Sequence, residues 1–150
     1  MCIRDSAPDA LTSDAGWDTI KHKQFLVEVI GQLKEAGIRT SIFIDPVEKM
    51  IEGAKEVGTD RIEFYTGPYA HQFGKARRKA VTPFATCAKL AHSLGLEINA
   101  GHDLNLKNLP YFVKNVPHVK EVSIGHALIS DALYMGLEKT ISLYQEACLG

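Results

Sequence analysis

Alternating apolar and polar positions mark four short stretches of the chain as β-strands. They are IRTSIFID (38–45), RIEFYTG (61–67), LEINAG (96–101) and EVSIGH (121–126). Around them, apolar residues recur at the spacing of amphipathic helices. The pattern therefore predicts strands and helices in alternation along the whole chain.

The predicted helices cover 18–36, 46–58, 70–94, 105–116 and 128–148. Pro83 lies inside the third and has no amide hydrogen to donate, so we expect two helices or one sharply kinked helix there. The fourth is expected to be short and broken near Pro110. The closing helix is expected to turn five apolar side chains inward: Ile129, Leu133, Leu137, Ile141 and Tyr144.

This alternation is typical of the α/β class, in which βαβ units build a parallel sheet. Four units in 150 residues match the density of a (β/α)₈ TIM barrel, whose usual length is about 250 residues. The chain is thus predicted to form half of such a barrel. A flavodoxin-like open sheet fits the same count, and in both folds ligands bind at the carboxyl ends of the strands.

Composition and charge narrow the classes of partner. The chain is 45% hydrophobic and 23% charged, with a net charge of -1, so no overall field attracts nucleic acid or an anionic membrane. No apolar run approaches the length of about 20 residues that spans a bilayer. Cys2, Cys87 and Cys148 lie far apart and are expected to be reduced thiols. We expect a soluble, cytoplasmic protein that binds small molecules or proteins.

Glycine and histidine end two successive predicted strands, in INAGH and SIGH. Gly125 allows the backbone to approach a ligand closely, and the first amides of the helix that follows are unpaired donors. The pair of Gly-His ends favours a phosphate site built from both turns. The alternative is that each glycine only supplies a tight turn.

Two further side chains are candidates for chemistry. His102 is the best candidate acid or base, because an imidazole exchanges protons near neutral pH. A hydrogen-bonded structural histidine is the alternative. Glu63 alternates with Ile62 and Phe64 and should face the barrel interior, where a carboxylate needs either a cation or a function. The histidines outside the strand ends are interpreted as surface residues: His22, His71, His92 and His118.

Five segments, taken in order, resemble the pyridoxine 5'-phosphate synthase family. They are LTSDAGWD (11–18), SIFID (41–45), IEFYTGPYA (62–70), LGLEINAGHDLNLKNL (94–109) and EVSIGHALISDALYMGLE (121–138). The resemblance implies that residues 8–150 are the last four βα units of a TIM barrel. It also implies an enzyme of vitamin B6 biosynthesis that condenses 3-amino-2-oxopropyl phosphate with 1-deoxy-D-xylulose 5-phosphate, releasing phosphate and water. Residues 1–7 match nothing and are interpreted as a non-native or disordered leader.

The resemblance also assigns roles to single residues. It implies that His102 is a proton donor and that Glu63 stabilises a charged intermediate. The implied substrate contacts are Thr12 for the pentulose phosphate and Asp103, through its backbone, Gly125 and His126 for the amino-ketone phosphate. No cofactor and no metal are implied. The implied partners are phosphorylated small molecules and, for the full-length protein, further copies of itself.

Some features depart from the family. Asp103 stands where some members have glycine, and Tyr65 where some have histidine. The family's early strands supply further proton acceptors and substrate-binding residues, so we expect this chain alone to be inactive and unstable, aggregation-prone or associated with another copy. Two other functions stay open. They are a non-catalytic phosphate-binding or interaction module, and a metal-dependent enzyme that uses Glu63, His102 and His126 as ligands.

Overall fold

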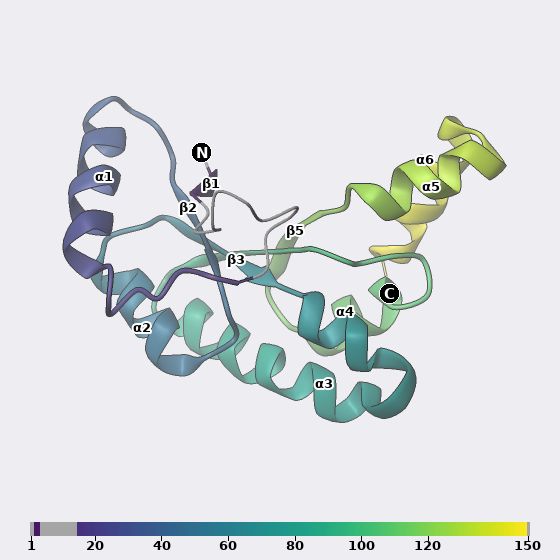
Figure 1. The fold of residues 1–150 in the computed structure, drawn as a ribbon, viewed down its shortest axis with the longest axis horizontal. Coiled ribbons are helices and arrows are strands. Elements are labelled where there is room, and N and C mark those ends of the chain that lie inside the picture. Colours follow the sequence, from purple (N-terminus) through teal and green to yellow (C-terminus); the bar gives the residue numbers. More distant parts are fainter. Residues whose placement is uncertain (1, 4–14, 150) are drawn as a thin grey trace.

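A parallel sheet lies at the centre of the computed structural model, which describes residues 2–3 and 15–149 (Figure 1). Its strands are β1 (Cys2–Ile3), β2 (Ser41–Ile44), β3 (Arg61–Tyr65), β4 (Glu97–Gly101) and β5 (Val119–Ser123). All neighbouring strands run parallel and pair in the order β1-β2-β3-β4-β5. The four predicted strands are therefore confirmed.

Helices follow the strands in alternation. They are α1 (Lys23–Glu35), α2 (Glu48–Glu56), α3 (Gly67–Ser93), α4 (Leu109–Asn115), α5 (His126–Met135) and α6 (Leu137–Ala147). The kink predicted in the third helix is present, but it lies at Ala76, whose φ of -152° is not helical, and the helix continues through Pro83. Pro110 does not break a helix. It lies in the first turn of α4, where a missing amide hydrogen removes no helical bond.

The prediction of one continuous closing helix was wrong. Gly136 has a φ of +82°, a left-handed conformation that glycine adopts without strain, and it separates α5 from α6. Tyr144 is buried as expected, but Leu133 is 82% exposed. Ile129, Leu137 and Ile141 are exposed as well. These side chains are exposed because no described segment covers this face, and α5 and α6 lie together at the end of the molecule away from α1 (Figure 1).

The two faces of the sheet differ in chemistry. Ile62, Phe64 and Ile98 point to the face that the helices cover and join one buried core. The intervening residues of the same strands, such as Glu63 and Asn99, form a polar face. Helices on one face and strands in chain order fit a partial barrel. They do not fit the flavodoxin-like alternative, which reverses its strand order and covers both faces with helices.

Aromatic rings make up much of the core beneath β3 and β4. Phe84 packs edge to face against Phe64 and Phe112, with ring centroids 5.6 Å and 5.4 Å away. Tyr69 is fully buried, and its hydroxyl donates a 2.7 Å hydrogen bond to the carbonyl oxygen of Asn108. Burial raises the pKa of Tyr69 well above its usual range, so it stays a neutral donor. This bond ties α3 to the segment after β4.

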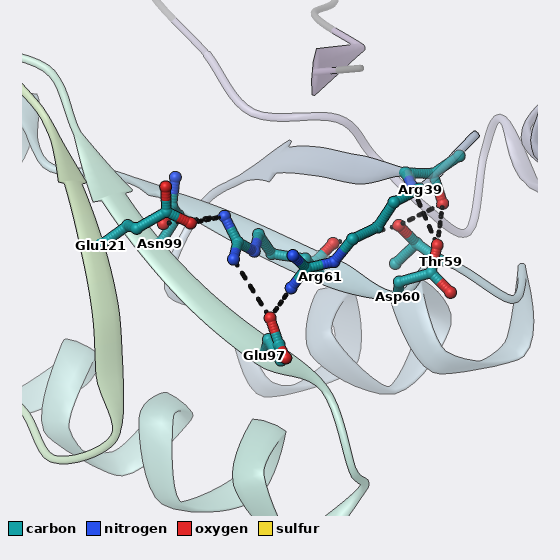
Figure 2. A network of polar contacts seen from close by, with 8 residues as sticks. Arg39, Thr59, Asp60, Arg61, Glu97, Asn99 and Glu121 are labelled. Carbon is teal, nitrogen blue, oxygen red and sulfur yellow. Dashed lines mark hydrogen bonds and ion pairs between the residues drawn. The ribbon is translucent and has the colours of Figure 1, made fainter.

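An ion-pair network occupies the polar face at the amino ends of the strands (Figure 2). The Arg61 guanidinium lies 3.1 Å from Glu97 Oε2, contacts the Glu121 carboxylate and donates a 3.4 Å hydrogen bond to Asn99 Oδ1. The Arg39 guanidinium also forms an ion pair with the Glu97 carboxylate. Charged groups therefore fill this end of the polar face, and the carboxyl ends of the strands are left for a ligand.

Candidate functional site

A cavity of about 850 Å³ opens at the carboxyl ends of the strands. It is lined by five of the six residues that sequence analysis singled out: Glu63, His102, Asp103, Gly125 and His126. The two Gly-His turns meet here because β4 and β5 pair in parallel, with Gly101 opposite Ser123. Thr12, the sixth, lies outside the described residues.

The turn after β4 has an unusual backbone. His102 and Asp103 have φ values of 88° and 57°, in the left-handed region that residues other than glycine rarely adopt. Thr66, at the end of β3, holds this turn in place. Its backbone amide and its hydroxyl donate to the carbonyl oxygen of Gly101 at 2.9 Å and 2.7 Å, and the hydroxyl also contacts the carbonyl oxygen of His102. The fold thus fixes the backbone from which the His102 ring projects.

Three groups surround the His102 ring. The ring of Tyr65 stands perpendicular to it with centroids 5.1 Å apart, and the ring of Phe43 lies 6.5 Å away. Asp103 Oδ2 lies 3.2 Å from His102 Nδ1, so a protonated ring forms an ion pair with its own neighbour. The two aromatic rings and the carboxylate together restrict the His102 ring to few orientations, as an acid or base requires.

Glu63 is buried, with 5% of its surface exposed, on the polar face of β3. Its carboxylate reaches over Gly101, where an added Cβ atom would lie 2.4 Å from Oε1. Arg61 precedes it by two residues on the same face and interacts with it electrostatically. The Glu63 carboxylate is buried, interacts with Arg61 and lines the cavity, so it can stabilise positive charge on a ligand.

The amino end of α5 forms another part of the cavity wall. Gly125 precedes this helix, and its carbonyl oxygen accepts the first helical hydrogen bond, from Ile129, at 3.2 Å. The backbone amides before Ile129 have no partner within the helix, and the helix dipole adds partial positive charge. Together with the His126 side chain, which lines the same cavity, these groups can hold an anion such as phosphate.

Sequence analysis missed one histidine of this cavity. His71 is exposed, as expected of a surface residue, and it also lines the cavity from the first turns of α3. Its place could have been found from its position shortly after the end of β3, because residues that follow a strand face the ligand in a parallel α/β fold. Ser123 and Ser130 also line the cavity and were not singled out.

Within residues 2–3 and 15–149, no three side chains of histidine, cysteine, aspartate or glutamate gather closely enough to hold a metal ion. Glu63, His102 and His126 line one cavity without forming such a cluster, so the geometry does not favour the metal-dependent alternative. Across the part of the chain that the structure describes, none of the helices is both long and apolar enough to cross a membrane.

Comparison with known proteins shows the family that this chain is similar to. A family model described as "Pyridoxal phosphate biosynthesis protein PdxJ" matches residues 1–149. The chain is 65% identical over 138 residues to the pyridoxine 5'-phosphate synthase of Christiangramia forsetii, covering 92% of this chain and 58% of that protein. It is 56% identical over 135 residues to the synthase of Flavobacterium johnsoniae, covering 90% of this chain and 57% of that protein.

The fold also resembles a solved structure of more distant sequence. A chain of the Amycolatopsis orientalis BexX/CysO complex superposes with a TM-score of 0.56 at 16% identity, covering 99% of this chain and 55% of that one. At this identity the likeness concerns the α/β fold alone. All these matches span only a little over half of the other protein.

Proposed function

The chain belongs to the PdxJ family of pyridoxal phosphate biosynthesis proteins, and on this premise we propose that residues 8–150 form the C-terminal part of a pyridoxine 5'-phosphate synthase. The proposed fold is the last four βα units of a (β/α)₈ barrel. The proposed reaction condenses 3-amino-2-oxopropyl phosphate with 1-deoxy-D-xylulose 5-phosphate and releases phosphate and water. The chain spans 58% of the Christiangramia forsetii relative, so the proposal concerns the completed protein, a cytoplasmic homo-oligomer.

One observation supports this function above the others: an acid–base group and an anion-binding site share one cavity. We call this site the anion cradle; it consists of the amino end of α5 with Gly125 and His126. His102 and Asp103 reach it from the end of β4, and Gly125 and His126 from the end of β5. A phosphoryl group at the amino end of α5 would therefore lie beside the imidazole of His102. Such proximity lets a bound phosphate ester orient its reacting carbon toward the acid.

The chemistry of condensation assigns a task to each group. An amine and a ketone first form a carbinolamine, which loses its hydroxyl as water and becomes a positively charged iminium. His102 supplies the proton that the departing hydroxyl needs. The Glu63 carboxylate, buried on the cavity wall, offsets the positive charge that remains on nitrogen.

The test uses a fusion protein, in which the N-terminal part of the Christiangramia forsetii relative precedes residues 8–150 of this chain. We expect the fusion protein to form pyridoxine 5'-phosphate in a coupled assay, and this chain alone to form none. His102→Asn in the fusion protein should lower kcat by about 10² to 10⁴, the usual contribution of a general acid.

His118→Asn is the matched control, because His118 is an exposed histidine just before β5, at the opposite end of the sheet from the cavity. It should leave kcat unchanged. A folded fusion protein without turnover, or equal effects of the two substitutions, would overturn the proposed function.

The length of the match favours a second candidate for the isolated chain, namely phosphate binding without turnover. The anion cradle lies wholly within this chain, whereas 42% of the Christiangramia forsetii relative lies outside the match (100% less the 58% that is covered). Titration of the chain with inorganic phosphate, followed by isothermal calorimetry, tests this candidate. Binding that His126→Ala abolishes supports it, and the absence of binding rejects it.

A further inference from the structure

We propose that Gly101 is a positioning residue for Glu63: the absence of a side chain at this point of β4 leaves the space in which the Glu63 carboxylate lies. The proposal rests on the proposed function, because it concerns the group that would stabilise the charged intermediate. It assigns different tasks to the two Gly-His pairs, which look alike in the sequence.

Backbone conformation does not require a glycine at this position. Gly101 is the last residue of β4, buried, and it pairs with Tyr65 on one side and Ser123 on the other. Among the described residues, the glycines with positive φ are Gly37, Gly58, Gly95 and Gly136. Because Gly101 has ordinary strand geometry, an alanine could adopt the same backbone.

The space beside this position does require a residue without a side chain. A Cβ atom on Gly101 would lie 2.4 Å from Glu63 Oε1, 3.1 Å from Ser123 Cβ and 3.3 Å from the Ser123 carbonyl oxygen. The first distance is far inside van der Waals contact, whereas the others are only tight. The atom that must yield is the end of a flexible side chain. The strand should therefore stay in place, and the Glu63 carboxylate should move.

The register of the sheet shows which way Glu63 now leans. Glu63 pairs with Asn99, two residues before Gly101 in β4. A carboxylate that lies over Gly101 is therefore tilted along the strand toward its carboxyl end, where His102 and the cavity lie. A methyl group at Gly101 would displace the carboxylate from this position.

The other Gly-His pair serves as a comparison within the same cavity. A Cβ atom on Gly125 would meet nothing within 4 Å. Gly125 thus leaves open space at the amino end of α5, where a ligand can approach the backbone, whereas Gly101 leaves space for a protein side chain. Only Gly101 is predicted to act through Glu63.

The test is Gly101→Ala in the fusion protein. We expect kcat to fall by at least about tenfold, because a displacement on the order of 1 Å in a catalytic group can lower the rate by about 10². The KM for the amino-ketone phosphate and the melting temperature should change little. Gly31→Ala is the matched control. Gly31 lies in α1, and a Cβ atom there would meet nothing within 4 Å, in contrast to Gly101.

A double-mutant cycle separates positioning from packing. If Gly101 acts through Glu63, then Gly101→Ala should have no further effect on kcat in a Glu63→Ala background. Additive effects, or a loss of activity that follows a loss of thermal stability, would overturn the proposal. If Glu63→Ala itself leaves kcat unchanged, the role of Glu63 in the proposed function fails instead.

A crystal structure of the Gly101→Ala fusion protein gives a readout that needs no activity. We expect the backbone of β4 to superpose on the parent and the Glu63 carboxylate to have moved. A carboxylate in its original place beside the new methyl group would refute the positioning role, whatever the kinetics of the fusion protein.

Discussion

The hydroxyl of Thr66 donates a 2.7 Å hydrogen bond to the carbonyl oxygen of Gly101, and so joins the end of β3 to the end of β4. Thr66 is fully buried, and its backbone amide donates to the same carbonyl oxygen. The turn that carries His102 thus depends on the polar side chain of the residue that follows β3, and not on the sheet ladder alone.

Thr66→Val tests this connection, because valine keeps the shape of threonine and removes the donor. We expect the free energy of unfolding of the fusion protein to fall by about 0.5 to 1.5 kcal/mol, the net contribution of one hydrogen bond, with a loss of kcat. The Gly101 carbonyl oxygen keeps the Thr66 backbone amide as its donor, so it is not left unpaired. Urea denaturation measures it. Thr82→Val is the control, since the exposed Thr82 hydroxyl bonds within its own helix. Equal losses in both variants would contradict the prediction.

Asp103 offers a second test, because its φ of 57° lies in the left-handed region. Asp103→Gly should leave thermal stability unchanged or raise it, since glycine adopts this conformation freely. Asp103→Val should lower stability by about 1 to 3 kcal/mol, because a branched side chain is strained there. Thermal unfolding measures the melting temperatures of the two variants. Equal melting temperatures would show that the turn is not strained.

Tyr65 is expected to hold the His102 ring through its own ring, which lies 5.1 Å away at 84°. Tyr65→Leu removes this edge-to-face contact, worth about 0.5 to 1.5 kcal/mol, and should lower kcat of the fusion protein more than it lowers stability. Tyr65→Phe keeps the ring and should retain more of the activity. If leucine and phenylalanine give the same kcat, the ring contact does not position His102.

Alkaline pH should reveal the buried thiol of Cys87. Burial, with a smaller effect of the Glu48 charge, raises the pKa of Cys87 from its ordinary 9.0 to about 11. The folded state therefore favours the neutral thiol. Its contribution to stability is complete below pH 9 and is lost as the pH rises toward 11. Denaturation between these pH values should show a steeper decline for the parent fusion protein than for Cys87→Ala.

The exposed apolar face of α5 and α6 predicts self-association of the isolated chain. Leu133 and Tyr134 are 82% and 90% exposed, and exposed apolar patches promote aggregation. Leu133→Glu should raise the fraction of monodisperse chain in light scattering. Val27→Glu, on the exposed side of α1, should not. The idea fails if both substitutions act alike.

The sequence predicts the sheet well because apolar and polar side chains alternate with the strand period. Ile62 and Phe64 face the core and Glu63 faces the cavity, as their alternation indicates. The meeting of His102 and His126 also follows from the sequence, because parallel strands bring their carboxyl ends to one edge.

Other features depend on contacts that a linear pattern does not contain. The apolar spacing of the closing helix continues across Gly136, so the pattern gives no sign of the left-handed break there. Which face of that helix is buried depends on the segments that cover it. The space at Gly101 becomes visible only when Glu63 is placed across the strands.

Pairing of each strand with its neighbour in the chain also affects how such a protein can be divided. A cut between two consecutive βα units leaves each strand joined to the helix that follows it, and it crosses one ladder of the described sheet. Two polypeptides divided at that point can therefore pair again edge to edge without threading one chain through the other, so split-protein complementation is a natural way to reassemble the proposed barrel from separately made pieces.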